Sequence, residues 1–230
     1  MLFFKKWNSI GYLQYNQNKI DMYKIALIIA FMVTSMLFAQ NNYEKGMQKA
    51  FDLWEEQKIE DAVNLFERIA SAEPDNWLPA YYAAEVLVLD GFTILKDKEK
   101  LEAQLNRAQG FIDDAAAISK DNPEIMVMQA LLHTVYVASD GATYGMTLSG
   151  KIANLYATAR GISPNNPRVL LNKAEWDMGA ARYFGQDTAP FCKDVEKAVE
   201  LFANFKPETK FHPNWGKERA EEVLKSCKEN

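Results

Sequence analysis

The stretch from Gly145 to Lys151 has the glycine and lysine spacing of a phosphate-binding loop, in which backbone amides and a lysine hold phosphates. The next position of such a loop is Ser or Thr, which binds Mg²⁺, but here it is Ile152. The stretch also follows a predicted helix rather than a strand. We therefore predict no nucleotide site, and interpret the glycines between residues 139 and 150 as turn-forming residues.

His133 and Asp140 have the residue types of a general acid/base pair, with Asp140 about two helical turns after the histidine. No nucleophile or third group accompanies them, so a hydrogen-bonded structural histidine remains the alternative. The other histidine, His212, precedes Pro213, and we expect it to have a role in a turn. No His or Cys pair has the spacing of zinc ligands. The sequence predicts no catalytic residue, no metal and no cofactor.

Cys192 and Cys227 could form a disulfide. We expect two antiparallel helices here, over 191–204 and 215–228, joined by a turn that contains Pro207. Each cysteine is about 13 residues from that turn, so at about 1.5 Å per residue both lie at the same end of the hairpin. We predict a bridge between them. Two buried free thiols are the alternative.

Helices are expected throughout the rest of the chain, because apolar residues recur at spacings of three and four and alternating strand patterns are absent. Turns rich in Pro and Asn separate the expected helix pairs. Pro74, Asp121, Pro164 and Pro207 mark these turns, and the successive intervals between them are 47, 43 and 43 residues. Repeated helix pairs predict a stack. The expected helices are 43–56, 59–71, 77–90, 98–118, 124–138, 150–162, 167–183, 191–204 and 215–228.

The first helical pair carries a specific pattern of small, large, small, aromatic and proline residues: Ala50, Leu53, Ala62, Phe66 and Pro74. In this pattern the chain resembles the tetratricopeptide repeat superfamily, specifically its small secreted bacterial members. The resemblance implies an all-α, right-handed superhelix of about four hairpins, with a capping helix from Trp215 onward. It also implies a protein-interaction module whose concave side is lined by the first helix of each pair.

The repeats are longer than the usual 34 residues, and the excess falls at 90–97, 139–149 and 184–190. We predict loops there, all on one edge of the stack. The loop 139–149 is the candidate recognition loop, whereas tucking of its apolar residues into the stack is the alternative. The candidate binding residues on the concave face and this loop are Tyr81, Glu85, Gln129, His133, Tyr136, Asp140, Tyr144, Met146, Asn172 and Trp176. For the concave set, core packing is the alternative.

The N-terminus has the features of a secretory signal. A lysine at position 24 precedes an uncharged apolar run from Ile25 to Phe38, followed by Ala39. We predict an upstream leader over 1–21 that is not translated, a signal peptide over 22–39 and a helical repeat domain over 40–230. A retained anchor is the alternative, although the run is shorter than the roughly 20 residues that span a bilayer.

Removal of residues 1–39 changes the net charge from −5 to −8, with 22 basic and 30 acidic side chains remaining. An acidic chain without a basic cluster is a poor ligand for nucleic acid or anionic lipid. We therefore expect a periplasmic or secreted protein without stable membrane insertion once the signal is removed.

The favoured function is a non-enzymatic module that binds another envelope protein or a peptide. The alternative is a small-molecule or glycan binder, or a hydrolase, that uses a cleft between His133 and loop 139–149. A structural component that self-associates is a third possibility.

Overall fold

The computed structural model describes residues 42–229, and the predicted leader and signal peptide lie outside this range. The chain divides into two compact units, Met1–Lys45 and Gly46–Asn230, and the second contains nearly all of the described residues. None of the described helices is both long and apolar enough to cross a bilayer.

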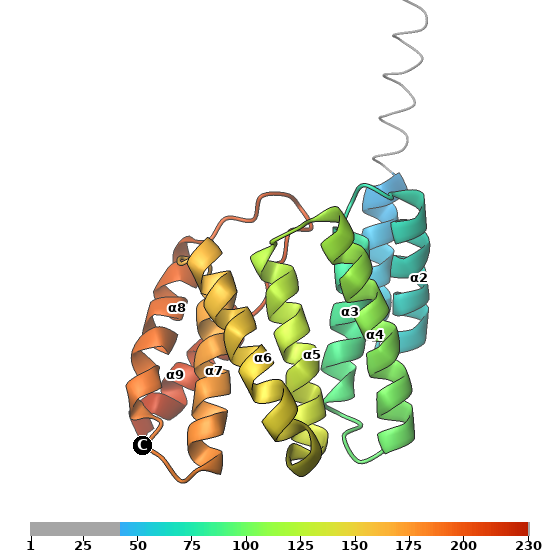
Figure 1. The fold of residues 1–230 in the computed structure, drawn as a ribbon. Coiled ribbons are helices and arrows are strands. Elements are labelled where there is room, and N and C mark those ends of the chain that lie inside the picture. Colours follow the sequence, from blue (N-terminus) through green and yellow to red (C-terminus); the bar gives the residue numbers. More distant parts are fainter. Residues whose placement is uncertain (1–41, 230) are drawn as a thin grey trace, which may run out of the picture. The chain divides into compact units, whose positions relative to one another are not determined.

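The described residues are all helix, turn and irregular segment, with no strand, which confirms the all-α prediction (Figure 1). Residues 42–55 are helical. The subsequent elements are α2 (Ile59–Ala72), α3 (Leu78–Gly91), α4 (Lys98–Ile118), α5 (Pro123–Ser139), α6 (Gly141–Ile162), α7 (Pro167–Tyr183), the short 3-10 helix η1 (Ala189–Phe191), α8 (Cys192–Asn204) and α9 (Lys217–Glu229).

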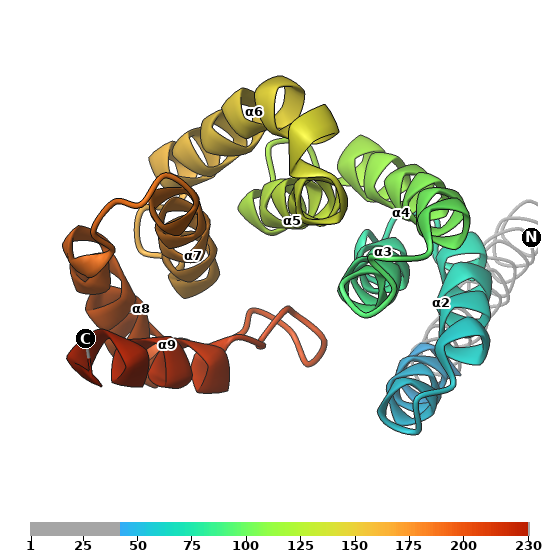
Figure 2. The same cartoon turned by 90° about the horizontal axis from the view of Figure 1, so that it is seen from below.

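The helices form two layers along an arc, with α3, α5 and α7 on the inner side and α4 and α6 on the outer side (Figure 2). The amino-acid composition of each helix explains whether it lies on the inner or the outer side. In α3 every residue from Leu78 to Val88 is buried, as expected for a helix that is apolar on all sides. In α2 the buried residues form one stripe, at Ala62, Val63, Phe66 and Ile69.

Helix starts follow local capping chemistry. Asn122 and Asn166 each precede a proline in the first turn and accept hydrogen bonds from the backbone N–H groups of α5 and α7. Asp97 caps α4 in the same way. These signals are why most predicted boundaries agree with the structure to within one or two residues.

The predicted loop over 139–149 is wrong. Helix α5 continues to Ser139, α6 begins at Gly141, and Asp140 alone separates them and accepts a hydrogen bond from the N–H of Thr143. The interpretation of the glycines between residues 139 and 150 as turn-forming residues was therefore wrong. A Cβ added to Gly141, Gly145 or Gly150 would meet nothing within 4 Å, so they lie on an open face of α6. A glycine there costs about 1 kcal/mol relative to alanine, which packing of α6 against α5 offsets.

The other two predicted insertions are irregular, at residues 92–97 and 184–188. Both lie at the same edge of this unit as the α5–α6 turn (Figure 1).

The predicted disulfide is confirmed. Cys192 opens α8 and Cys227 lies in the last turn of α9, with a Cα–Cα distance of 5.9 Å and an S–S bond of 2.12 Å. The two helices pack against each other, and Val223 of α9 shares a buried cluster with Val195 of α8.

The connection between α8 and α9 is more than a turn. Residues 205–216, here called the inner segment, leave α8 and cross the inner side of the arc toward α3 before α9 begins (Figure 2). The helix predicted from residue 215 begins at Lys217, and the connection predicted over 205–214 is a 12-residue segment that crosses the inner side of the arc. Because this segment covers part of the inner face, it limits which ligands that face can bind.

Candidate ligand-binding groove

Three contacts hold the inner segment against the inner helices. The hydroxyl of Tyr82 donates to the carbonyl of Phe211 at 2.8 Å, and the indole N–H of Trp215 donates to the hydroxyl of Tyr81 at 2.9 Å. The ring of Phe205 lies 4.4 Å from the guanidinium of Arg168, a cation–π contact. Tyr81 and Tyr82 belong to α3 and Arg168 to α7, so the segment bridges distant parts of the arc.

Arg168 is fixed by a buried ion pair between consecutive inner helices. Its Nε and Nη2 each donate to Glu124 at 2.7 Å, and the Asn166 amide donates to the same carboxylate at 2.6 Å. Glu124 follows Pro123 and Arg168 follows Pro167, so the pair joins equivalent positions of two repeats. Such a pair adds little net stability relative to an apolar pair, but it is costly to break. It therefore fixes the relative position of α5 and α7.

Beside the inner segment lies an open groove of about 480 Å³. Its walls come from the helix over 42–55, from α3 and from the inner segment. The lining residues are Gln48, Phe51, Trp54, Tyr82, Glu85, Leu89, Lys210, Phe211, His212, Asn214 and Trp215. This volume is within the range of about 300–1,000 Å³ that is usual for small-molecule sites, and five of the residues carry large aromatic rings.

The aromatic rings of the groove support each other. Phe51 contacts Tyr82 edge-to-face at a centroid distance of 4.6 Å, and it stacks with Phe211 at 6.0 Å and Trp54 at 6.5 Å. Offset and edge-to-face contacts of this kind contribute about 0.5–1.5 kcal/mol each beyond area burial. The rings are held in place before any ligand arrives.

The titratable side chains of the groove are largely uncharged at neutral pH. Burial, and to a lesser extent the charge of Glu124, raise the pKa of Glu85 to about 8, against the opposing effects of Arg168 and a hydrogen bond with Tyr81. Burial, the largest effect, lowers the pKa of His212, which favours the neutral form of its imidazole. Lys210 is exposed and lies over the Phe211 ring at 5.1 Å. The site therefore presents apolar rings with one cation at its rim.

Of the residues predicted for the concave face, Glu85 lines this groove and Tyr81 lies directly beneath the inner segment. Asn172 is buried and donates to the carbonyl of Arg168 within α7. Trp176 packs against the core cluster formed by Val127 and its neighbours. The inner segment covers part of the face that was expected to be open for a peptide.

The remaining predicted residues are on the outer side, between α4, α5 and α6. Gln129 exchanges hydrogen bonds with Gln109 of α4 at 2.7 Å and lies 3.4 Å from His133. Tyr136 packs against Tyr144 at a centroid distance of 5.1 Å.

The two residues that were considered as an acid/base pair, His133 and Asp140, are not joined by a hydrogen bond. Asp140 caps α6 and pairs with Lys98 at 3.1 Å, whereas burial and Lys151 lower the pKa of the half-buried His133. Met146 is 96% exposed on α6. Because residues 141–149 are helical, the cleft expected between His133 and a loop over 139–149 lacks the loop that would form its wall.

The groove residues that the sequence analysis missed are Gln48, Phe51, Trp54, Tyr82, Leu89, Lys210, Phe211, His212, Asn214 and Trp215. One signal was available. The predicted connection over 205–214, together with the first residue of the predicted capping helix, carries three large aromatics, Phe205, Phe211 and Trp215, within 11 residues. Apolar rings at that density in an irregular segment indicate that it packs against the protein rather than running over its surface.

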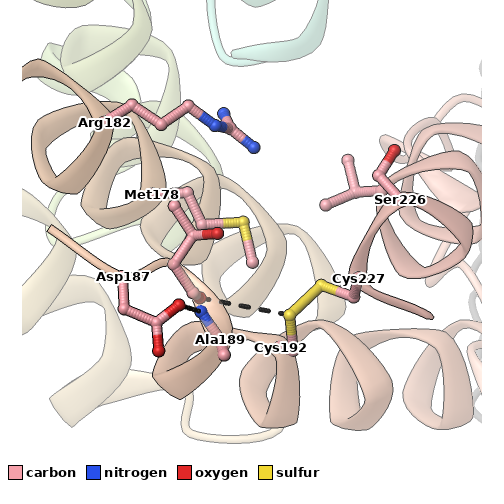
Figure 3. A pocket seen from close by; sticks show the side chains of 9 residues that line it. Met178, Arg182, Asp187, Ala189, Cys192, Ser226 and Cys227 are labelled. Atoms are coloured by element: carbon pink, nitrogen blue, oxygen red, sulfur yellow. Dashed lines mark hydrogen bonds between the residues drawn. A yellow bond between two sulfur atoms is a disulfide. The ribbon is translucent and has the colours of Figure 1, made fainter. Parts of the chain in front are cut away.

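A second hollow lies beside the disulfide and is much smaller, at about 60 Å³ (Figure 3). Met178 and Arg182 of α7 line it together with Cys192, Ser226 and Cys227. Asp187 and Ala189 also line it, and the Asp187 carboxylate accepts a hydrogen bond from the N–H of Ala189 at 2.9 Å. A space of this size holds one or two water molecules and is too small for an organic ligand.

Comparison with known proteins identifies the fold. No protein family matches the sequence, and no curated protein matches it either. Among solved structures, the chain is similar to the HusA haemophore from Porphyromonas gingivalis, with a TM-score of 0.71 and 21% identity, over 81% of this chain and 93% of that one. At this identity the likeness shows a shared all-helical fold.

Proposed function

We propose that this protein is a non-enzymatic binding protein that carries a planar, largely apolar molecule of the tetrapyrrole class, such as haem, in the groove beside the inner segment. The observation that carries the proposal is the lining of the groove by five aromatic residues from three separate elements. Flat rings favour a flat ligand because stacking and edge-to-face contacts are geometrically specific.

The inner segment argues against a peptide as the ligand of the inner face. An extended or helical peptide would need the surface that Phe211 and Trp215 already cover through their contacts with Tyr82 and Tyr81. The space that remains is a compact groove with the size of a small-molecule site. A small-molecule binder was the second function class expected from the sequence, although at a different place.

Haem is the member of the class that we favour. A haemophore carries haem, and the HusA haemophore shares the fold of this chain. The groove fits the chemistry of such a cargo. Its rings would cover the macrocycle, and Lys210, with Gln48 and Asn214 at the same groove, offers donors for the carboxylates at one edge of haem.

The rest of the proposal follows from the sequence. The four hairpins would form a right-handed superhelix of the tetratricopeptide kind, and the protein would act in the periplasm or outside the cell after removal of residues 22–39. A carrier of this type needs a second envelope protein that receives its cargo. We therefore also propose a protein partner.

Titration of the purified protein with haem and with iron-free protoporphyrin tests this function. Trp54 and Trp215 line the groove, so a bound porphyrin should quench tryptophan fluorescence and shift the porphyrin absorption band in a saturable, one-to-one manner. Trp54→Ala should weaken binding of both ligands about tenfold, as expected for an aromatic anchor.

Tyr183→Ala is the matched control, because Tyr183 is an aromatic residue 78% exposed outside the groove. It should leave both affinities unchanged. Absence of saturable binding of either porphyrin, or equal loss in the two variants, would refute the proposal.

A further inference from the structure

His212 is the residue of the groove best suited to bind a metal centre. It lies in the inner segment and lines the groove, with a side chain that is 13% exposed. Its ring packs between two aromatic rings, edge-to-face with Trp77 and tilted against Phe205, each at a centroid distance of 6.1 Å. These contacts restrict the orientation of the imidazole, which a metal ligand requires.

The two nitrogens of this imidazole have different surroundings. Nδ1 lies 4.0 Å from a carboxylate oxygen of Glu208, and the backbone N–H of His212 is bonded to the carbonyl of Thr209 at 3.1 Å. Among the described residues, the polar contacts of His212 involve its backbone N–H and Nδ1, and none involves Nε2. A ligating histidine typically turns its other nitrogen toward a carboxylate or carbonyl, which fixes the tautomer and makes the ligating nitrogen more basic.

The other groups of the groove are less suited to iron. Among the protein ligands that hold haem iron are His, Cys, Met and Tyr. Neither Met nor Cys lines the groove, and both cysteines form the disulfide. The hydroxyl of Tyr82 is already bonded to the carbonyl of Phe211.

We propose that His212 is the axial ligand of a haem iron bound in the groove, through Nε2. This inference rests on the proposed function, since it names the protein ligand of that cargo. Bound haem would bring the iron, and the chain would contribute the imidazole, its fixed orientation and the surrounding rings. Ligation would add affinity for haem that an iron-free porphyrin does not gain, so the two ligands separate the inference from the function.

The sequence supplies a matched control. It contains two histidines, and His133 lies on the outer side beside Gln129, away from the lining of the groove. The experiment compares the wild type with His212→Ala and His133→Ala, each titrated with ferric haem and with iron-free protoporphyrin. The Soret region of the absorption spectrum reports ligation, and fluorescence quenching reports binding.

In the expected result, His212→Ala binds haem at least about tenfold more weakly with an altered Soret band, whereas its affinity for iron-free protoporphyrin changes less than about twofold. Added imidazole restores the wild-type spectrum of His212→Ala, and His133→Ala behaves as the wild type. If His212→Ala binds haem with the wild-type affinity and spectrum, the inference is wrong and the binding function stands. If the wild type binds neither porphyrin, the function and the inference both fail.

A second measurement needs no variant, in case His212→Ala does not fold. Wild-type protein labelled with ¹⁵N at histidine gives signals from two side chains, and gallium protoporphyrin is a diamagnetic substitute for ferric haem. Addition of this complex should shift one imidazole strongly, with iron-free protoporphyrin producing no shift of that size. Equal, small shifts with both ligands would overturn the assignment.

Discussion

Glu85 is a carboxyl group with almost no access to water. It is 2% exposed, one of its oxygens has no hydrogen-bond partner, and its pKa of about 8 is above the ordinary value of 4.5. The folded state therefore binds this proton more tightly than the unfolded state. Stability from this group is fully present below about pH 4.5 and is lost as the pH rises through 8.

The first prediction concerns this residue. Between pH 5 and pH 9 the free energy of unfolding of the wild type should fall relative to that of Glu85→Gln by about 4 kcal/mol, because the pKa is raised from 4.5 to about 8. Glutamine keeps the shape without the proton. Urea unfolding at the two pH values measures the difference. Glu55→Gln, at an exposed position of the helix over 42–55, should follow the wild type at both pH values, and parallel profiles for Glu85→Gln and wild type would contradict the pKa.

The second prediction concerns the buried ion pair. Arg168→Met should lower the free energy of unfolding by about 3–5 kcal/mol, because it leaves the carboxylate of Glu124 buried without its cation. The double variant Glu124→Gln/Arg168→Met should recover part of that loss. Urea denaturation of Arg168→Met, Glu124→Gln and the double variant gives a double-mutant cycle. If the losses in free energy of unfolding of the two single variants add up to that of the double variant, the two side chains do not interact.

Among the helices, predictability from sequence followed the strength of local signals. The starts of α5 and α7 were predicted because Asn122-Pro123 and Asn166-Pro167 combine a cap with a first-turn proline. The disulfide followed from helix length alone. The first turns of α6 were missed, because packing against α5 overrides the low helix propensity of three glycines.

The inner segment could not be predicted, since it has no periodicity and its position depends on contacts 129 and 134 residues away in sequence. Most of the residues that line the groove could therefore not be predicted from the sequence. Glu85 was selected as a binding residue because it lies on the first helix of a pair, which was expected to line the concave side. His212, in the connection before the capping helix, was outside that reasoning.

The third prediction tests the helical assignment of residues 141–149. Gly145→Ala should raise the free energy of unfolding by about 0.5–1 kcal/mol, because the added Cβ meets nothing within 4 Å and alanine favours helix. A loop would gain nothing of this kind. Gly216→Ala is the contrasting change and should destabilise, since Gly216 has a φ of 101° and its Cβ would lie 2.9 Å from the Phe202 ring. Thermal or urea unfolding of the two variants decides the matter, and a loss on Gly145→Ala would argue against the helix.

Across the whole described unit, the Cys192–Cys227 bridge stabilises the hairpin of α8 and α9 that carries the inner segment at its other end. The bridge joins residues separated by 35 positions. In the loop-entropy account, closing a loop of this length stabilises the folded state by about 3–4 kcal/mol.

The fourth prediction concerns this bridge. The double variant Cys192→Ala/Cys227→Ala should lose about 3–4 kcal/mol in urea unfolding relative to the oxidised wild type. Intact mass with and without reductant establishes the starting state, with a gain of about 2 Da on reduction of one bridge. Equal stability of the oxidised wild type and the double variant would show that the bridge does not constrain the unfolded chain.

The groove has a consequence for the order in which the protein becomes functional. One wall, with Phe51 and Trp54, comes from the first described helix, and the opposite wall, with Phe211 and Trp215, comes from near the end of the chain. Because synthesis proceeds from the N-terminus, the residues of the first wall are made before those of the second. A chain without residues 205–216 therefore lacks Phe211 and Trp215, and under the proposed function it would bind cargo only after this segment is in place.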